Sequence, residues 1–109
     1  MTLVIKSECI DVKDGACAAV CPVDCIYEGE RMFYIHPSEC IECGICESVC
    51  PVDAIRFEDE IGEEAKGFIA INRDVFSDAA GALTSPGGWS RKSPPIRDHP
   101  AVAARARRN

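Results

Sequence analysis

The sequence predicts an α+β fold in which two short strand–helix–strand units are related by a pseudo-twofold axis and carry a C-terminal extension. The first observation is an internal repeat, in which residues 21–26 (CPVDCI) match residues 50–55 (CPVDAI) at an offset of 29 residues. The second is that short β-prone runs flank both copies. The third is that all eight cysteines lie within the first 50 residues of a 109-residue chain. A chain of this length has room for one such domain.

The strands come from short apolar runs that pair as antiparallel hairpins. We expect them at residues 3–5, 26–27, 33–35 and 55–57. The Glu-Gly-Glu-Arg segment at 28–31 has the composition of a turn between the second and third of these strands. Short helices are expected between the cysteines, at residues 16–20 and 45–49. Each must end at a Cys-Pro pair, because the residue before a proline is disfavoured in helical geometry.

The second half of the chain is predicted to add an extension to this core. We expect the core to cover residues 1–60 and the extension to cover residues 61–109, packed on the core or trailing from it. A further short helix is expected at residues 72–77. Repeated proline and glycine after Gly81 disfavour long regular elements there, and residues 101–108 could form a short basic helix.

Charge is distributed unevenly along the chain. Residues 1–78 carry 17 acidic and 6 basic side chains, a balance of −11, and residues 79–109 carry one acid and six bases, a balance of +5, which together give the net charge of −6. An acidic body repels nucleic acid and favours a basic protein partner. No apolar run approaches the roughly 20 residues that span a bilayer, so no membrane span is expected. The first residues lack the pattern of a secretory signal. We therefore expect a cytoplasmic protein whose cysteines bind metal rather than form disulfides.

The cysteines of the second copy have the spacing C-x2-C-x2-C-x3-C-P, at Cys40, Cys43, Cys46 and Cys50. This spacing is typical of iron–sulfur sites, because two-residue gaps let successive thiolates converge on one compact inorganic core. The first copy keeps the outer cysteines and lacks one in the middle. It consists of Cys9, Cys17 and Cys21, with Val12 at the place of the missing ligand. A valine cannot ligate iron.

The rigid Cys-Pro turn carries the last thiolate of each run to the other side of the motif, so we expect the two runs to exchange their last ligands. One group is then Cys21, Cys40, Cys43 and Cys46, which would hold a 4Fe–4S cluster. The other group is Cys9, Cys17 and Cys50, which has three thiolates and would hold a 3Fe–4S cluster. A carboxylate of Asp11 or Asp14 could supply a fourth ligand there, although soft thiolates suit this iron better.

Other interpretations of these residues have less support. Structural zinc sites usually pair two C-x2-4-C clips, whereas here three cysteines share one C-x2-C-x2-C run. The eighth cysteine, Cys25, has Ala54 as its counterpart. It is either a small buried hydrophobe or a spare ligand or redox-reactive thiol beside the complete cluster. His36, which precedes a proline, is expected to be structural, and His99 carries little information. No nucleophile–base pair, phosphate loop or nucleotide fingerprint is present, so no catalytic residue and no enzymatic activity are expected.

The chain as a whole resembles bacterial seven-iron ferredoxins, which carry one 3Fe–4S and one 4Fe–4S cluster. The resemblance covers the cysteine motifs from Cys9 to about Phe57, including PVDCIYEG at 22–29 and IHP-x-EC at 35–40, and continues more weakly through Asn72 and SPGG at 85–88. It implies the ferredoxin-type fold and the ligand groups given above, with Cys25 as the non-ligating cysteine. Two features depart from the family: Ala65, where relatives often have tryptophan, and the arginine-rich end of the chain.

The resemblance also implies a function. It implies a soluble carrier that passes single, low-potential electrons from a ferredoxin reductase or another donor to an acceptor oxidoreductase, such as a haem-thiolate monooxygenase. Two alternatives stay open. One is a dedicated electron-transfer subunit of a larger enzyme complex, docked through the C-terminal extension. The other is a redox or iron sensor that uses the vacant corner of the three-iron core together with Cys25.

Overall fold

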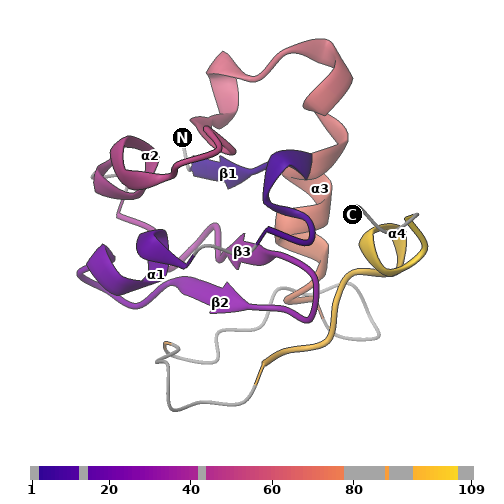
Figure 1. Cartoon of the computed structure of the whole chain (residues 1–109), viewed down its shortest axis with the longest axis horizontal. Coiled ribbons are helices and arrows are strands. Elements are labelled where there is room, and N and C mark those ends of the chain that lie inside the picture. The colour runs from indigo at the N-terminus through magenta and orange to yellow at the C-terminus, as the bar shows by residue number, and fades with distance from the viewer. Residues whose placement is uncertain (1–2, 13–14, 42–43, 78–87, 89–94, 106–109) are drawn as a thin grey trace.

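The computed structural model describes residues 3–12, 15–41, 44–77, 88 and 95–105, and Figure 1 shows its chain path. Four short strands form two antiparallel pairs, β1 (Leu3–Ile5) with β4 (Ile55–Phe57) and β2 (Ile26–Glu28) with β3 (Phe33–Ile35). The α-helices of the described residues are α1 (Ala16–Val20), α2 (Ile45–Val49), α3 (Gly67–Asp74) and α4 (Pro100–Ala103). Single turns of 3-10 helix lie at Ser7–Cys9, Glu58–Glu60 and Glu63–Ala65. The predicted α+β class with short antiparallel strands is confirmed.

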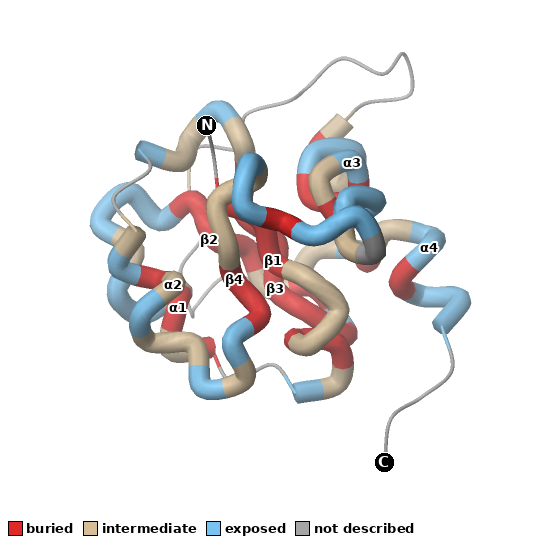
Figure 2. The backbone as a smooth tube through the Cα atoms, turned by 90° about the horizontal axis from the view of Figure 1, so that it is seen from above, coloured by how far each residue is buried: buried red, intermediate tan, exposed pale blue. Residues whose placement is uncertain are grey.

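The strands lie between two groups of helices. Figure 1 shows α1 and α2 together on one side of the strands and α3 on the other, with α4 on the same side as α3. In Figure 2 the strands form the buried centre of the molecule, and the outer faces of the helices are exposed. Every residue of β1 and β3 is buried. Neither of these strands therefore has the solvent-facing side that an isolated hairpin would present.

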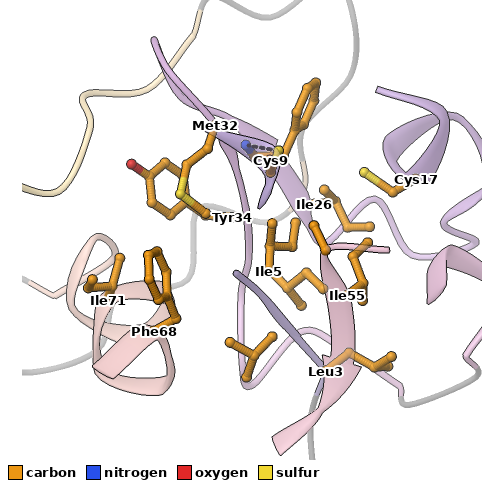
Figure 3. Close-up of a cluster of buried hydrophobic side chains, with 14 of the residues drawn as sticks. Leu3, Ile5, Cys9, Cys17, Ile26, Met32, Tyr34, Ile55, Phe68 and Ile71 are labelled. Atoms are coloured by element: carbon orange, nitrogen blue, oxygen red, sulfur yellow. Dashed lines mark hydrogen bonds between the residues drawn. The ribbon is translucent and has the colours of Figure 1, made fainter. Parts of the chain in front are cut away.

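The hydrophobic core continues from the strands to α3. Figure 3 shows Phe68 and Ile71 of α3 on one side of the strand residue Ile5, and Cys17 on the other. Burying an aliphatic or aromatic side chain of this size contributes roughly 1.5–3 kcal/mol. A two-stranded hairpin is marginal by itself in water, so the packing of α3 on the strands is what stabilises them. The largest fully buried side chains include Leu3, Ile5, Ile26, Tyr27, Tyr34 and Ile55.

Most predicted elements lie where the sequence indicated, and the main difference is in the extension. The helix expected at 72–77 lies at Gly67–Asp74, because Phe68 and Ile71 dock on the strands and set its position. The expected basic helix begins at Pro100, and within the described residues it ends at Ala103. Residues 81–87 and 89–94, including Trp89, lie outside the described residues. The pseudo-twofold axis and the boundary at residue 60 stay predictions.

Asn72 of α3 joins the two antiparallel strand pairs. Its Oδ1 accepts hydrogen bonds from the backbone N–H groups of Ile5 on β1 (3.3 Å) and Ile35 on β3 (3.0 Å). Its Nδ2 donates to the carbonyl oxygens of Ile5 and Phe68, each at 2.9 Å. The side chain is 2% exposed, so water cannot replace these bonds. One amide thereby satisfies backbone groups of both strand pairs and fixes α3 over them.

We expect Asn72→Ala to destabilise the protein by about 3 kcal/mol, because buried backbone donors and acceptors would lose their partner. Hydrogen exchange at the Ile5 and Ile35 amides should accelerate in the same variant. The matched control is Arg73→Ala, at a half-exposed position of the same helix, for which we expect a change below about 0.5 kcal/mol. Denaturation midpoints of the metal-loaded proteins measure both effects. Equal midpoints for the two variants would contradict the joining role of Asn72.

Candidate metal centres

The two cysteine segments have the same backbone geometry. A glycine in the left-handed conformation precedes each five-residue helix, Gly15 (φ 82°) before α1 and Gly44 (φ 79°) before α2. Both helices end at a cysteine that precedes proline, and the backbone of these cysteines, Cys21 and Cys50, is extended (ψ 118° and 116°). Glycine tolerates the left-handed region, and the residue before proline disfavours a helix. The sequence therefore sets both ends of each helix.

The turn that follows each Cys-Pro pair is also the same in both copies. Asp24 (φ 53°) and Asp53 (φ 59°) are both left-handed, a conformation that aspartate tolerates better than most residues. The backbone N–H of the next residue, Cys25 or Ala54, then donates to the Sγ of the cysteine four positions earlier, at 3.4 Å in both copies. Both turns therefore direct a backbone donor at the sulfur of a predicted ligand.

Cys9, Cys17 and Cys50 line one cavity. Cys50 belongs to the second copy of the repeat, so the structure brings together the three cysteines that the sequence analysis assigned to one group. The backbone N–H of Phe33 on β3 donates to the Cys9 Sγ at 3.4 Å, shown as a dashed line in Figure 3. This contact was not predicted, because it joins residues that only the fold brings together. Val12 lines the same cavity and offers it no donor atom.

Cys21, Cys40 and Cys46 line a second cavity. These are three of the four cysteines assigned to the other group, and the fourth, Cys43, lies outside the described residues. Cys25 lines this cavity too, is 2% exposed, and places its Sγ 3.4 Å from that of Cys21. It is therefore buried beside the predicted ligands rather than on the surface.

Both cavities suit an iron–sulfur core. Each cavity is lined by three of the predicted cysteine ligands. The remaining lining is mainly aliphatic, from residues that include Ile5 and Ile55 in the first cavity and Leu3 and Ile26 in the second. Soft thiolates in an apolar surround match the ligand preference of iron–sulfur clusters.

Burial also acts on the thiols themselves. It raises the pKa of Cys17 to about 12, with a further contribution from the negative charge that Cys9 would carry. The pKa of Cys25 is raised by its hydrogen bond to Cys40 and then by burial. Both thiols therefore keep their protons at neutral pH in the absence of metal. Cys17, as a predicted ligand, must lose its proton when metal binds. Metal binding and thiol deprotonation in this site are therefore coupled.

The other candidate residues have structural roles. Asp11 directs its carboxylate to the guanidinium of Arg31, at 2.7 and 3.0 Å, and Asp14 lies outside the described residues. His36 is fully buried, and its Nδ1 accepts the backbone N–H groups of the following turn. The Nδ1 of His99 accepts from the N–H of Ala101 and caps α4. Arg31 was not predicted as important, because an arginine in a turn has no sequence pattern that distinguishes it from a surface residue.

Comparison with known proteins agrees with this geometry. The family described as 4Fe-4S binding domain matches residues 33–56. A ferredoxin from Streptomyces griseus is 53% identical over 94% of this chain and 93% of its own length. The chain belongs to the ferredoxin family. A ferredoxin from Mycolicibacterium smegmatis is 50% identical over 93% of this chain and 92% of its own length. A relative described as ferredoxin 7Fe, from Hydrogenibacillus schlegelii, is 57% identical over 70% of this chain and 97% of its own length.

Membership of this family confirms two expectations from the sequence. The resemblance to bacterial ferredoxins is confirmed, and a ferredoxin is an iron–sulfur electron-transfer protein rather than an enzyme. Among the helices that the structure describes, none combines the length and the apolar character needed to cross a bilayer. The roles of the individual cysteines as ligands stay predictions.

The left-handed glycine before α2 gives a test of the local geometry of this ferredoxin. We expect Gly44→Ala to destabilise the metal-loaded protein by about 1 kcal/mol, because a side chain is strained at φ 79°. Gly67→Ala is the control, since nothing lies within 4 Å of the added Cβ at this start of α3. It should be neutral or stabilise by up to about 1 kcal/mol. Denaturation midpoints followed by the visible cluster absorption distinguish the two, and a stabilising Gly44→Ala would contradict this account.

Proposed function

We propose that this ferredoxin is a cytoplasmic one-electron carrier with two unlike clusters. In this proposal Cys9, Cys17 and Cys50 hold a 3Fe–4S cluster, and Cys21, Cys40, Cys43 and Cys46 hold a 4Fe–4S cluster. The observation that carries it is the composition of the first cavity, where three thiols meet Val12 in place of a fourth. The similarity to a relative described as ferredoxin 7Fe supports the same count.

The clusters, when bound, supply a one-electron change with little rearrangement of the protein. The chain brings the two sites close together. Leu3 lines the second cavity and Ile5 the first, so the single strand β1 reaches both. Cys17, within α1, lines the first cavity, and Cys21, directly after α1, lines the second. Such short connections favour passage of an electron between the sites within one molecule.

Two features around the thiols act on the reduction potential of the clusters in opposite directions. Backbone N–H groups donate to the Sγ atoms of Cys9, Cys21 and Cys50, which offsets negative charge and raises the potential. The apolar lining and the acidic body, with its balance of −11 over residues 1–78, disfavour an added electron and lower the potential. We expect low potentials for both clusters, with the four-iron cluster the lower of the two.

An apolar face over the two cavities supports docking of a protein partner there. The exposed large hydrophobic residues of the described chain all belong to the two cysteine segments: Val12, Val20, Val23, Ile41 and Ile45. An aliphatic side chain such as Ile41, which is 57% exposed, contributes little burial energy to the stability of the free protein. A donor such as a ferredoxin reductase, or an acceptor oxidoreductase such as a haem-thiolate monooxygenase, would cover this face. Basic groups on the partner would match the acidic body.

The alternative is a dedicated subunit of a larger complex that docks through its extension. The structure gives this alternative less support, because the described part of the C-terminal segment packs on the chain's own β2–β3 hairpin. The N–H of Ile96 donates to the carbonyl oxygen of Glu28 at 2.7 Å, and Val102 is fully buried. We propose accordingly that residues 61–109 form an extension packed on the core of residues 1–60.

The iron content of the purified protein tests the proposal. We expect seven irons per chain and, in the air-oxidised protein, the electron paramagnetic resonance signal of an oxidised three-iron core. Replacing Val12 with Cys should raise the count to eight and remove that signal, because a fourth thiolate would then line the first cavity. Val23→Cys serves as the control, since this residue lines the second cavity, and it should leave the three-iron signal intact. Eight irons in the unmodified protein would rule out the proposed clusters.

Electron transfer from a ferredoxin reductase tests the docking face. We expect Ile45→Ser to lower kcat/KM by about threefold to tenfold, a range typical of one contact residue in an interface. Cluster content and potential should stay unchanged, because Ile45 is 45% exposed and is not among the residues that line the two cavities. Ala103→Ser, on α4 at the opposite side of the strands, should not change the rate. A rate unchanged in Ile45→Ser would place the docking face elsewhere.

A further inference from the structure

Arg31 is a buried cation that connects the segment after Cys9 to the C-terminal helix. The side chain is 5% exposed. Its Nε and Nη2 donate to the two carboxylate oxygens of Asp11, at 3.0 and 2.7 Å. Its Nη1 donates to the carbonyl oxygens of Val102, at 2.9 Å, and Arg105. These carbonyls lie at the C-terminal end of α4, where a positive charge is favourable.

The C-terminal segment is fastened to the same turn at a second point. The Asp98 Oδ1 accepts from the Arg31 backbone N–H at 3.2 Å and from the Tyr34 hydroxyl at 2.9 Å. The close approach depends on Gly29, because a Cβ there would lie 2.6 Å from Asp98 Oδ1 and 2.4 Å from Tyr34 Cε1. Arg31 is therefore held in place by the extension and cannot easily change its conformation.

Asp11 lies beside the predicted vacant corner but points away from it. It is the neighbour of Val12, which lines the first cavity, whereas Asp11 is not among the described residues of that lining. Its backbone is left-handed (φ 64°), and its N–H donates to the Arg31 carbonyl oxygen at 2.7 Å. Both the main chain and the side chain of Asp11 are thus bound by Arg31.

We propose that Arg31 withholds the Asp11 carboxylate from the three-iron core and thereby keeps this site at three irons. The inference rests on the proposed function, in which Cys9, Cys17 and Cys50 hold that core. A carboxylate is a competent ligand of ferrous iron, and the vacant corner lacks only such a donor. Arg31 is a positioning residue, because it acts through Asp11. The difference between three and four irons in this site is then set by an ion pair as well as by the missing cysteine.

Arg31 would prevent the conversion of the three-iron core into a four-iron core, which needs one electron and one ferrous ion. One electron from dithionite reduces the oxidised three-iron core. A ferrous ion then adds to it, with no further electron exchanged, and gives a core of four irons with the same four sulfides. The Asp11 carboxylate forms an iron–oxygen bond and displaces a water molecule from the incoming ion. The Arg31 guanidinium loses its carboxylate partner in the same step.

The experiment incubates the cluster-loaded, full-length protein with dithionite and isotopically labelled ferrous iron, followed by anaerobic desalting. Retained label per chain and the remaining three-iron paramagnetic signal are both measured. We expect Arg31→Met to take up label faster than the unmodified protein by about tenfold or more, a factor that corresponds to one good hydrogen bond to a charged group. The double variant Asp11→Asn, Arg31→Met should lose this acceleration, because the amide is a poor substitute for the carboxylate.

The control is Arg56→Met, which removes a similar bidentate pair with Asp53 in the second copy of the repeat, where Asp53 is 68% exposed. It should behave as the unmodified protein. If Arg31→Met fails to load its clusters, Arg31→Lys takes its place, because a lysine cannot bind both carboxylate oxygens of Asp11 as the guanidinium does. Faster uptake than in the unmodified protein, lost again in Asp11→Asn, Arg31→Lys, supports the proposal, and uptake equal to that of the unmodified protein overturns it. Uptake in the double variant as fast as in Arg31→Met also overturns it. An unmodified protein without a three-iron signal would instead overturn the proposed function.

Discussion

The turn at each Cys-Pro pair is the constraint on which the cysteine sites depend. It ends a five-residue helix and places the last thiol of each run apart from the others of its own run. Cys50 therefore lies with Cys9 and Cys17, and Cys21 lies with Cys40 and Cys46. Because each cavity takes thiols from both copies of the repeat, neither half of the chain can form its site alone. Two segments separated by 29 residues in the repeat are thereby made into one folding unit.

The strands and α3 hold the two cysteine segments in this arrangement. Strands of three residues supply few hydrogen bonds, and the two antiparallel strand pairs are joined chiefly by packing and by the amide of Asn72. The same strands provide groups that face the thiols, since Phe33 of β3 donates its N–H to Cys9. Core packing and the geometry of the candidate metal centres are therefore not separate properties. A change that moves β3 also moves a donor to sulfur.

Local patterns in the sequence were sufficient for most of the core. The strands at 3–5, 33–35 and 55–57 and the helices at 16–20 and 45–49 have the predicted bounds, because β-branched runs and Cys-Pro pairs act within a few residues. The position of α3 could not be predicted in this way. It depends on Phe68 and Ile71 docking against strands more than thirty residues away in sequence. The grouping of Cys50 with Cys9 was expected from the chemistry of the motif, whereas the contact of Arg31 with Asp11 needed the folded chain.

The two copies of the repeat contain the same kind of ion pair in different surroundings. Arg31 and Asp11 are 5% and 11% exposed, whereas Arg56 and Asp53 are 33% and 68% exposed. Water and salt screen the second pair, so it holds its loop only weakly. The first pair is shielded, and separating it would leave a buried charge without a partner. The first copy, which has Val12 in place of a cysteine, therefore has a neighbouring segment that a shielded ion pair holds in place.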